Sequence, residues 1–285
     1  MRVLITGANG QLGRALQQCL HAHEVTALGH PDLDITDAAA VGKAIISARP
    51  EIVIHAAAWT DTAGCERDPS RALLVNGQGT RNIAEVCREA GAALLYVSSN
   101  EVFDGEKGAP YDEDDAPNPI NAYGRSKLAG EVAVHETLGQ HYIVRTSWVY
   151  GPGRVSFPEK ILSAAAEQQK IRAVTDEIAS PTWTNNLAEA ITLLIQTNEF
   201  GVYHLAGEGE CSRKEWAAEV LRLANVDVAV EATTQAAFEL PVRKPVRSTL
   251  ANNRGAALRV ALRPWRDALA DHMRLVAETR AGASA

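Results

Sequence analysis

The sequence has few cysteines, and their arrangement points to no function. The 4 cysteines (Cys19, Cys65, Cys87 and Cys211) stand far apart without C-x-x-C spacing, so we predict reduced thiols that pack as small apolar side chains. No apolar run is long enough to cross a bilayer, and lysine and arginine form no cluster in a chain of net charge −7. These absences argue against nucleic acid and membranes as partners.

The first residues lack the features of a secretion signal. MRVLITGANG has only a short apolar run before a glycine-rich turn, so we expect a cytoplasmic protein. With 285 residues, 46% of them hydrophobic and 22% charged, the chain is typical of a globular protein with one large or two modest domains.

Short apolar runs alternate with amphipathic segments through the first two thirds of the chain. The runs cover residues 2–6, 24–28, 51–56, 93–98 and 142–147, and they are nearly continuous, as in parallel strands covered on both faces. Amphipathic segments follow at 11–20 and at 37–50, where Asp37 stands in the position of a helix cap. The alternation predicts an α/β fold with a doubly wound, Rossmann-type, mostly parallel sheet.

The pattern changes after Trp148. A loop rich in glycine and proline at 151–160 leads into a predicted helix that ends near Lys170. A second helix is predicted at 187–197 and a strand at 201–207. The residues after 207 are predicted to be mostly helix and loop. We predict a Rossmann-type domain over residues 1–150, to which residues 180–206 return. Residues 151–179 and 207–285 form a smaller C-terminal substrate-binding lobe.

Three glycines directly follow the first predicted strand. GANGQLG places Gly7, Gly10 and Gly13 between a strand and a helix. Small residues there let the backbone approach a pyrophosphate, and the helix start offers free N–H donors and the positive end of the helix dipole. We predict that this turn binds a dinucleotide and is more than a tight turn.

The ends of the next two strands bear on the cofactor. The second strand is followed by Gly29 and His30. An NAD site usually has a carboxylate there that holds the ribose 2′-hydroxyl, and its absence leaves room for the 2′-phosphate of NADPH. We therefore favour NADPH as the cofactor, with NADH as the alternative. After the third strand, Ala56, Ala57 and Ala58 are small enough for a cofactor to lie along the backbone, or for tight packing beneath a helix. We predict for His55 a satisfied place at the strand end, without a catalytic role.

A tyrosine and a lysine stand four residues apart in NAYGRSKLAGE. On a helix, Tyr123 and Lys127 lie on one face, and a nearby ammonium lowers the pKa of a phenol toward the range of general acid–base catalysis. Lysine can also hold the nicotinamide ribose. VSSNEVFDG, after the fourth strand, supplies a hydroxyl for a carbonyl oxygen from Ser98 or Ser99.

The G-x-x-G-x-x-G spacing together with Tyr-x-x-x-Lys resembles the extended short-chain dehydrogenase/reductases. Longer stretches narrow the resemblance: LLYVSSNEVFDG, AYGRSKLAGE, RTSWVYG, DEIASPT and GVYHLAG are similar to those of dTDP-4-dehydrorhamnose reductases, from Met1 to about Met273. That family reduces the 4-keto group of dTDP-4-dehydro-6-deoxy-L-mannose with NADPH or NADH and forms dTDP-L-rhamnose.

The resemblance assigns roles to residues by position. It implies a catalytic set of Ser99, Tyr123 and Lys127. It implies cofactor contacts from Gly7, Gly10, Gln11, Leu12, Gly13, Asp34, Ile35, Ala56, Ala57, Ala58, Tyr123 and Lys127. It implies substrate contacts from Ser99, Asn100, Glu101, Tyr123 and Trp148, the last with a core aromatic as the alternative.

Three departures from the family pattern qualify the assignment. Asn100 replaces a common aspartate beside the sugar, and Glu101 replaces a frequent tyrosine, which leaves the identity of the sugar open. Ala15 stands where some relatives have a glutamate that binds Mg²⁺ at a dimer interface, so we expect no metal site, and a homodimer remains one alternative.

Other functions stay open at this point. They are a sister reductase for another deoxysugar, such as a dihydrostreptose-like unit, a non-catalytic NADP(H)-binding regulatory subunit, and an epimerase or dehydratase suggested by Glu101. In the basic stretch VRKPVRSTL, Arg243, Lys244 and Arg247 are candidates for binding the diphosphate of the dTDP-sugar, and a solvated surface run is the alternative.

Overall fold

A six-stranded parallel sheet with the order β10-β5-β4-β3-β1-β2 forms the centre of the computed structural model, which describes residues 1–238 and 241–283, with side chains through Glu278. Its strands are β1 (Arg2–Thr6), β2 (Glu24–Leu28), β3 (Ile52–His55), β4 (Ala93–Ser99), β5 (His141–Thr146) and β10 (Gly201–His204). The strand order reverses between β1 and β3. Ligands bind outside the carboxyl ends of the strands at such a switch point.

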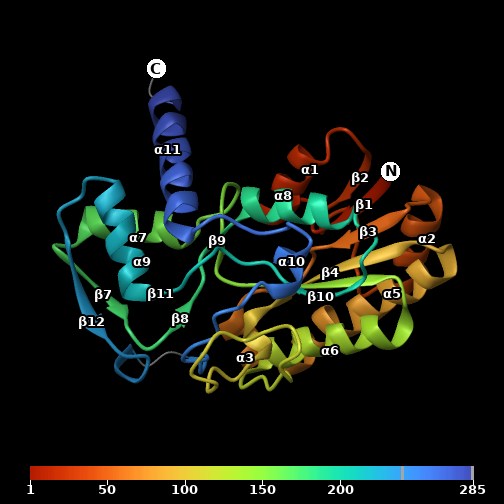
Figure 1. Ribbon diagram of the computed structural model, residues 1–285, viewed down its shortest axis with the longest axis horizontal. Helices are drawn as coiled ribbons and strands as arrows, with labels where there is room; N and C mark the ends of the chain where they lie inside the picture. The colour runs from red at the N-terminus through yellow and green to blue at the C-terminus, as the bar shows by residue number, and fades with distance from the viewer. Residues whose placement is uncertain (239–240, 284–285) are drawn as a thin grey trace.

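Helices cover both faces of this sheet (Figure 1). One face carries α1 (Gln11–Cys19) and α8 (Thr184–Leu194), and the other carries α2 (Ala38–Ala48), α5 (Gly79–Ala90) and α6 (Ala122–Thr137). Successive strand residues point to opposite faces, so Val3 and Ile5 pack under α1 and α8 while Leu4 packs under α2 and α5. The predicted doubly wound fold is confirmed.

Side-chain caps set where two of the helices begin. The Asp37 carboxylate accepts the N–H groups of Ala39 and Ala40 at 2.9 and 3.0 Å, so its predicted role at the start of α2 is confirmed. The Asn121 side chain accepts the N–H of Gly124 at 2.8 Å and starts α6, which carries Tyr123.

Short elements join the sheet to its helices. Between β3 and α5 the chain forms α3 (Thr62–Arg67), α4 (Pro69–Ala72) and the π-helical turn η1 (Leu73–Gln78). The 3-10 turn η2 (Asn100–Val102) directly follows β4, and α10 (Asn253–Ala257) lies beside β10 (Figure 1).

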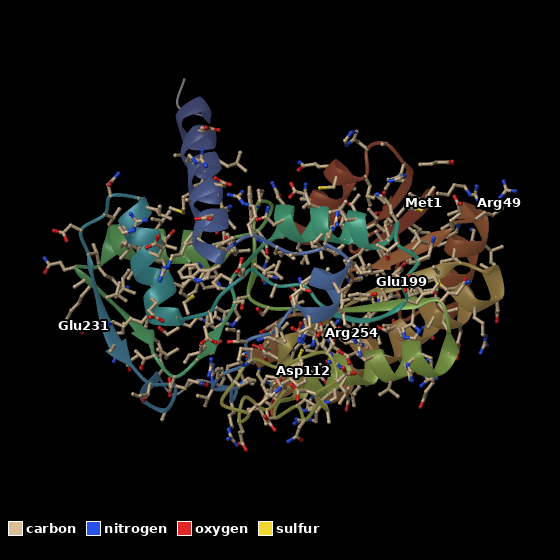
Figure 2. All side chains as sticks on the ribbon, viewed as in Figure 1. Met1, Arg49, Asp112, Glu199, Glu231 and Arg254 are labelled. Atoms are coloured by element: carbon tan, nitrogen blue, oxygen red, sulfur yellow. The ribbon has the colours of Figure 1, made fainter. Side chains whose placement is uncertain are left out.

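The lobe packs around its own apolar cluster, in which Trp216 is the largest fully buried side chain. Its helices are α7 (Phe157–Glu167), α9 (Arg213–Leu223), α11 (Trp265–Ala283) and the 3-10 turn η3 (Ala236–Phe238). Its paired strands are β7 (Lys170–Val174) with β12 (Ala229–Thr233) and β8 (Ile178–Ala179) with β11 (Cys211–Ser212). A further pair, β6 (Val149–Tyr150) with β9 (Thr182–Trp183), lies outside the ranges predicted for the lobe. Glu231 on β12 and Arg49 after α2 mark opposite ends of the molecule (Figure 2).

The lobe differs from the sequence expectation in its strands. The helix expected to end near Lys170 stops at Glu167, because Gln168 has extended backbone and Lys170 begins β7. β12 also falls in a stretch expected to be helix and loop, since its mostly exposed residues form no apolar run. Residues 253–257 belong to the range predicted for the lobe, but they lie beside β10 of the central sheet. The division of the chain into two domains by residue ranges stays a prediction. Across residues 1–238 and 241–283, no helix combines the length and the apolar character needed to span a membrane.

Candidate active site

The turn after β1 has the backbone geometry of a phosphate-binding turn. Gly7 has a φ of +72°, and a Cβ there would lie 2.6 Å from the backbone nitrogen of Ala57. A Cβ on Gly13 would lie 2.3 Å from the Gly7 carbonyl oxygen. Within the described part of the chain no side chain caps α1, so the first N–H groups of this helix can donate hydrogen bonds to an anion.

Gln11 and Leu12 face this turn with their backbone, because their side chains point elsewhere. The Gln11 side-chain amide donates to the Gly151 carbonyl at 2.5 Å, which ties the turn to the loop that enters the lobe. Leu12 is buried in the core beneath α1. Both N–H groups belong to the first turn of the helix, so the cofactor contacts of these residues stay predictions and would be made by the backbone.

Gly7→Ala is expected to weaken NADPH binding roughly tenfold or more, because backbone strain and the clash with Ala57 displace the turn. Gly91→Ala is the matched control: Gly91 also has a positive φ, +67°, but a Cβ there meets nothing within 4 Å. The dissociation constant for NADPH, measured by fluorescence titration, should change only in the first variant. Equal binding by both variants would contradict a phosphate site at this turn.

The end of β3 lies against the turn. Ala56, Ala57 and Ala58 are half-buried there. His55 is fully buried, and its ring nitrogens pair with Thr6 Oγ1 at 2.7 Å and Thr80 Oγ1 at 3.1 Å. Burial lowers the pKa of His55 to about 3, so the ring is neutral, and its predicted place as a satisfied strand-end histidine is confirmed.

The structure at the end of β2 shows why residue 29 is a glycine and what the carboxylates of Asp32 and Asp34 bind. A Cβ on Gly29 would lie 2.1 Å from the side-chain nitrogen of Asn9, and the Gly29 N–H donates to the Asp32 carboxylate at 2.8 Å. Asp34 accepts the Thr36 N–H at 2.9 Å, and Ile35 is buried. Asp34 therefore holds the turn before α2, while the contact of Asp34 and Ile35 with an adenine stays a prediction.

The structure brings the three predicted catalytic residues to the carboxyl end of β4. Ser99, 7% exposed, ends β4, and its hydroxyl accepts the N–H of Glu101 at 3.1 Å. It also lies within hydrogen-bonding reach of the Tyr123 phenol. Tyr123 and Lys127 are one turn apart on α6. Ser99 and not Ser98 is the hydroxyl next to the phenol, because Ser98 turns to Glu131.

The electrostatics of this set differ from the sequence expectation. Burial, and next the Glu101 carboxylate, raise the pKa of Tyr123 well above its ordinary value. Lys127 Nζ donates to the Val97 carbonyl at 2.7 Å and lies 4.2 Å from the centre of the Tyr96 ring. Burial lowers the pKa of Lys127 to about 7. The prediction of a lowered pKa for Tyr123 is wrong in its net direction, since burial and Glu101 outweigh any lowering by Lys127.

A buried ion pair beneath the site was missed by the sequence analysis. Arg145 on β5 and Glu131 on α6 pair at 2.8 Å with side chains that are each 5% exposed. The Ser98 hydroxyl also donates to Glu131, at 2.5 Å. Glu131 stands four residues after Lys127, so helical spacing puts it on the same face and was the available signal.

The predicted substrate residues Asn100, Glu101 and Trp148 have different surroundings. Asn100 donates to Ser248 Oγ at 2.7 Å, and Glu101 pairs with Lys244 at 2.6 Å. Trp148 has a φ of +43° and is half-buried, with the Arg213 guanidinium carbon 3.6 Å from its ring centre. Their contacts with substrate stay predictions.

The basic stretch after residue 241 is largely paired with carboxylates. Lys244 pairs with Glu101 and Arg247 with Glu210, at 2.6 and 2.7 Å. Arg243 is 72% exposed and lies 3.6 Å from Glu106. A substrate diphosphate would have to compete with these carboxylates for Arg243, Lys244 and Arg247.

The dinucleotide turn and the Ser99–Tyr123–Lys127 set define the protein as an NAD(P)H-dependent oxidoreductase of the Rossmann type. Residues 1–277 match the family model described as the RmlD substrate binding domain. The dTDP-4-dehydrorhamnose reductase of Streptomyces griseus is 41% identical over 280 residues, which cover 95% of this chain and 92% of that protein.

Solved structures agree with this match over nearly the whole chain. A dTDP-4-dehydrorhamnose reductase from Clostridium acetobutylicum superposes with a TM-score of 0.94 at 36% identity, covering 97% of this chain and 99% of the other. One from Bacillus anthracis, in complex with NADP, gives 0.91 at 36% identity and covers 95% and 98%. The chain belongs to the dTDP-4-dehydrorhamnose reductase family, and the resemblance seen in the motifs is confirmed.

Proposed function

We propose that the protein reduces the 4-keto group of a dTDP-4-dehydro-6-deoxy sugar with NADPH, and that its substrate is dTDP-4-dehydro-L-rhamnose, which becomes dTDP-L-rhamnose. The observation that supports this best is the Ser99 hydroxyl beside the Tyr123 phenol at the end of β4. The family membership supports the substrate class. A cytoplasmic location belongs to the same proposal, and a homodimer stays a prediction.

The residues around the β1 turn fit a dinucleotide cofactor. Gly7 and Gly13 leave the space that a Cβ would fill, and the open N–H groups of α1 suit a pyrophosphate. The small side chains of Ala56 to Ala58 after β3 would let the cofactor lie along the backbone, and on α6 Lys127 would hold the nicotinamide ribose beside Tyr123. NADPH, when bound, supplies the hydride that reduces the ketone.

The protein contributes the proton and the orientation of the ketone. The Ser99 hydroxyl would donate a hydrogen bond to the carbonyl oxygen, and Tyr123 would donate its phenolic proton to the same oxygen. Its raised pKa keeps the phenol protonated at neutral pH, as an acid must be, and an alkoxide is basic enough to take that proton. Lys127, one turn away, would stabilise the phenolate that remains.

A sister substrate is the second candidate, because two positions near the catalytic set differ from the family pattern. Asn100 and Glu101 bond across to Ser248 and Lys244 and present an amide and an ion pair where relatives commonly have aspartate and tyrosine. A different deoxysugar, such as a dihydrostreptose-like unit, would meet this altered wall.

A panel of dTDP-4-keto-6-deoxy sugars tests both candidates. NADPH oxidation should be fastest with dTDP-4-dehydro-L-rhamnose and give one dTDP-L-rhamnose per NADPH. Turnover of another sugar with failure on this one would support the sister reductase. Product formed without net NADPH consumption would instead indicate an epimerase or dehydratase.

The cofactor preference should follow from the end of β2. We expect NADPH to be preferred over NADH, and His30→Asp to lower that preference roughly tenfold or more, because a carboxylate at this exposed position repels a 2′-phosphate. His30→Asn is the neutral control and should leave the ratio of kcat/KM values nearly unchanged. Equal ratios for both variants would place the adenosine ribose elsewhere.

A further inference from the structure

Residues 242–250, here called the cross-lobe segment, run between the lobe and the end of β4. Ser248 donates its N–H to the Ile178 carbonyl of the lobe at 3.0 Å, and Arg247 donates its N–H to the Gly105 carbonyl, just past η2, at 3.3 Å. The segment is therefore held from both sides. Its side chains reach the residues that follow Ser99.

Lys244 of this segment forms an ion pair with Glu101. Lys244 Nζ lies 2.6 Å from Glu101 Oε1, and the two side chains are only 13% and 16% exposed. Water screens such a pair less than a surface pair, so each charge affects its neighbours. Glu101 is the residue whose backbone N–H donates to the Ser99 hydroxyl.

The second carboxylate oxygen of Glu101 is tied to the helix that carries the acid. The Asn121 side-chain amide donates to Glu101 Oε2 at 2.8 Å, and Asn121 also caps α6 through Gly124. A Cβ on Gly124 would lie 2.0 Å from the Glu101 carbonyl oxygen, so η2 presses directly on the first turn of α6. A shift of Glu101 would move the cap of the helix that bears Tyr123.

Glu101 is also the carboxylate with the largest effect on the Tyr123 phenol. After burial, it contributes most to raising the pKa of Tyr123, ahead of Cys65. At Cys65, Lys244 opposes the effect of Glu101, so the ammonium field reaches this side of the site. The charged or titratable groups that face Tyr123 or adjoin it are Glu101 from η2, Tyr96 from β4, Cys65 and Glu66 from α3 and Lys127 from α6, with Lys244 of the cross-lobe segment behind Glu101.

We propose that Lys244 is a positioning residue for the reduction, and that by pairing with Glu101 it sets how readily Tyr123 gives up its proton. The inference rests on the proposed ketoreduction. An unpaired Glu101 carboxylate would oppose the negative charge that develops on the phenol. Paired with Lys244, the same carboxylate holds Asn121 and opposes that charge less than an unpaired carboxylate would, while the backbone N–H of Glu101 orients Ser99. The lobe thereby contributes to the chemistry, in addition to any role in binding the sugar.

The test compares four forms of the full-length enzyme: wild type, Lys244→Met, Glu101→Gln and the double variant. Each is assayed for kcat and for the pH dependence of kcat/KM with NADPH and the best substrate of the panel. Lys244→Met should lower kcat about tenfold. It should also move the alkaline limb of the pH profile of kcat/KM up by roughly one pH unit, because the lone Glu101 carboxylate raises the pKa of Tyr123. Glu101→Gln should move it down, because the lone ammonium lowers that pKa. The double variant should move it back toward wild type.

Several outcomes would overturn the proposal. If Lys244→Met raises only KM for the sugar and leaves the limb in place, Lys244 binds the substrate diphosphate instead. If all variants lose activity equally without an ordered shift of the limb, the pair is merely structural. Arg243→Met is the matched control, since its exposed pair with Glu106 should leave the limb where it is.

A second readout keeps this inference separate from the proposed function. The ¹³Cζ resonance of Tyr123, assigned by its loss in Tyr123→Phe and titrated in the NADP⁺ complex, should show the same order of pKa values among the variants. An enzyme that reduces no sugar of the panel would refute the proposed function, while an unordered phenol titration would refute the role of Lys244.

Discussion

Tyr123→Phe is expected to lower kcat for sugar reduction by about three orders of magnitude and to leave NADPH affinity within about threefold of wild type. The phenol is the proton donor beside Ser99, whereas the pyrophosphate of the cofactor would be held at the β1 turn, on another part of the sheet edge. Phenylalanine keeps the ring and removes only the hydroxyl. The loss should therefore appear in kcat and hardly in the dissociation constant of NADPH.

The measurement is steady-state reduction with saturating NADPH, together with a fluorescence titration of the cofactor. Tyr203→Phe is the matched control, because its hydroxyl donates to the Glu199 carbonyl away from Ser99. Substantial activity in Tyr123→Phe would mean that another group donates the proton. A wild-type protein that binds NADPH but reduces no sugar would support the regulatory subunit instead.

Arg145→Met is expected to lower the free energy of unfolding by about 3–5 kcal/mol, because it leaves the Glu131 carboxylate buried without its cation. Arg145 donates to Glu131 through Nε at 3.0 Å and Nη2 at 2.8 Å, so methionine removes two charge-assisted hydrogen bonds at once. The remaining Ser98 hydroxyl cannot neutralise the carboxylate. The variant should also bind protons more readily as it folds, since a lone buried carboxylate favours its neutral form.

Urea unfolding followed by circular dichroism gives this free energy. The double variant Glu131→Leu/Arg145→Met should recover much of the loss, because neither charge remains buried. Lys170→Met removes the exposed pair with Glu231 and should cost no more than about 1 kcal/mol. A loss for Arg145→Met as small as that for Lys170→Met would show that the buried pair contributes little to folding.

The parts of the fold that sequence reasoning predicts are those encoded by neighbouring residues. Strands β1, β3, β4 and β5 are largely buried, so each carries a nearly continuous apolar run, and the bounds of β1 to β5 fall within one residue of the prediction. The cap at Asp37 depends on residues two and three positions away. By contrast, β12 exists because it pairs with β7 about sixty residues earlier, and its own sequence carries little signal.

The same distinction holds within the active site. Tyr123 and Lys127 are four residues apart, so a helix brings them together wherever it lies. The partners of Glu101 and Asn100 are 143 and 148 residues away, and only the folded chain shows that Lys244 and Ser248 reach them. Sequence reasoning considered the effect of Lys127 on the phenol and had no means to weigh burial or Glu101, which reverse the direction of the pKa shift.

The residues expected to select the sugar are only partly readable from the sequence. Asn100 and Glu101 are visible in the sequence as departures from the family pattern, but what they do depends on the lobe. Because each bonds to the cross-lobe segment, the surface after β4 is built jointly by η2 and that segment, and a sugar bound there would meet both. This explains why the reaction type is better predicted from sequence than the substrate.

Transfer of deuterium from NADPH that carries two deuterium atoms at nicotinamide C4 tests the central claim most directly. With dTDP-4-dehydro-L-rhamnose in ordinary water, the account predicts a dTDP-L-rhamnose that carries one deuterium at C4 for each deuterated NADPH consumed by hydride transfer, detected by NMR and mass spectrometry. A product without deuterium at C4, or conversion of the sugar with no loss of NADPH, would contradict the assignment of this site as a nucleotide-sugar 4-ketoreductase.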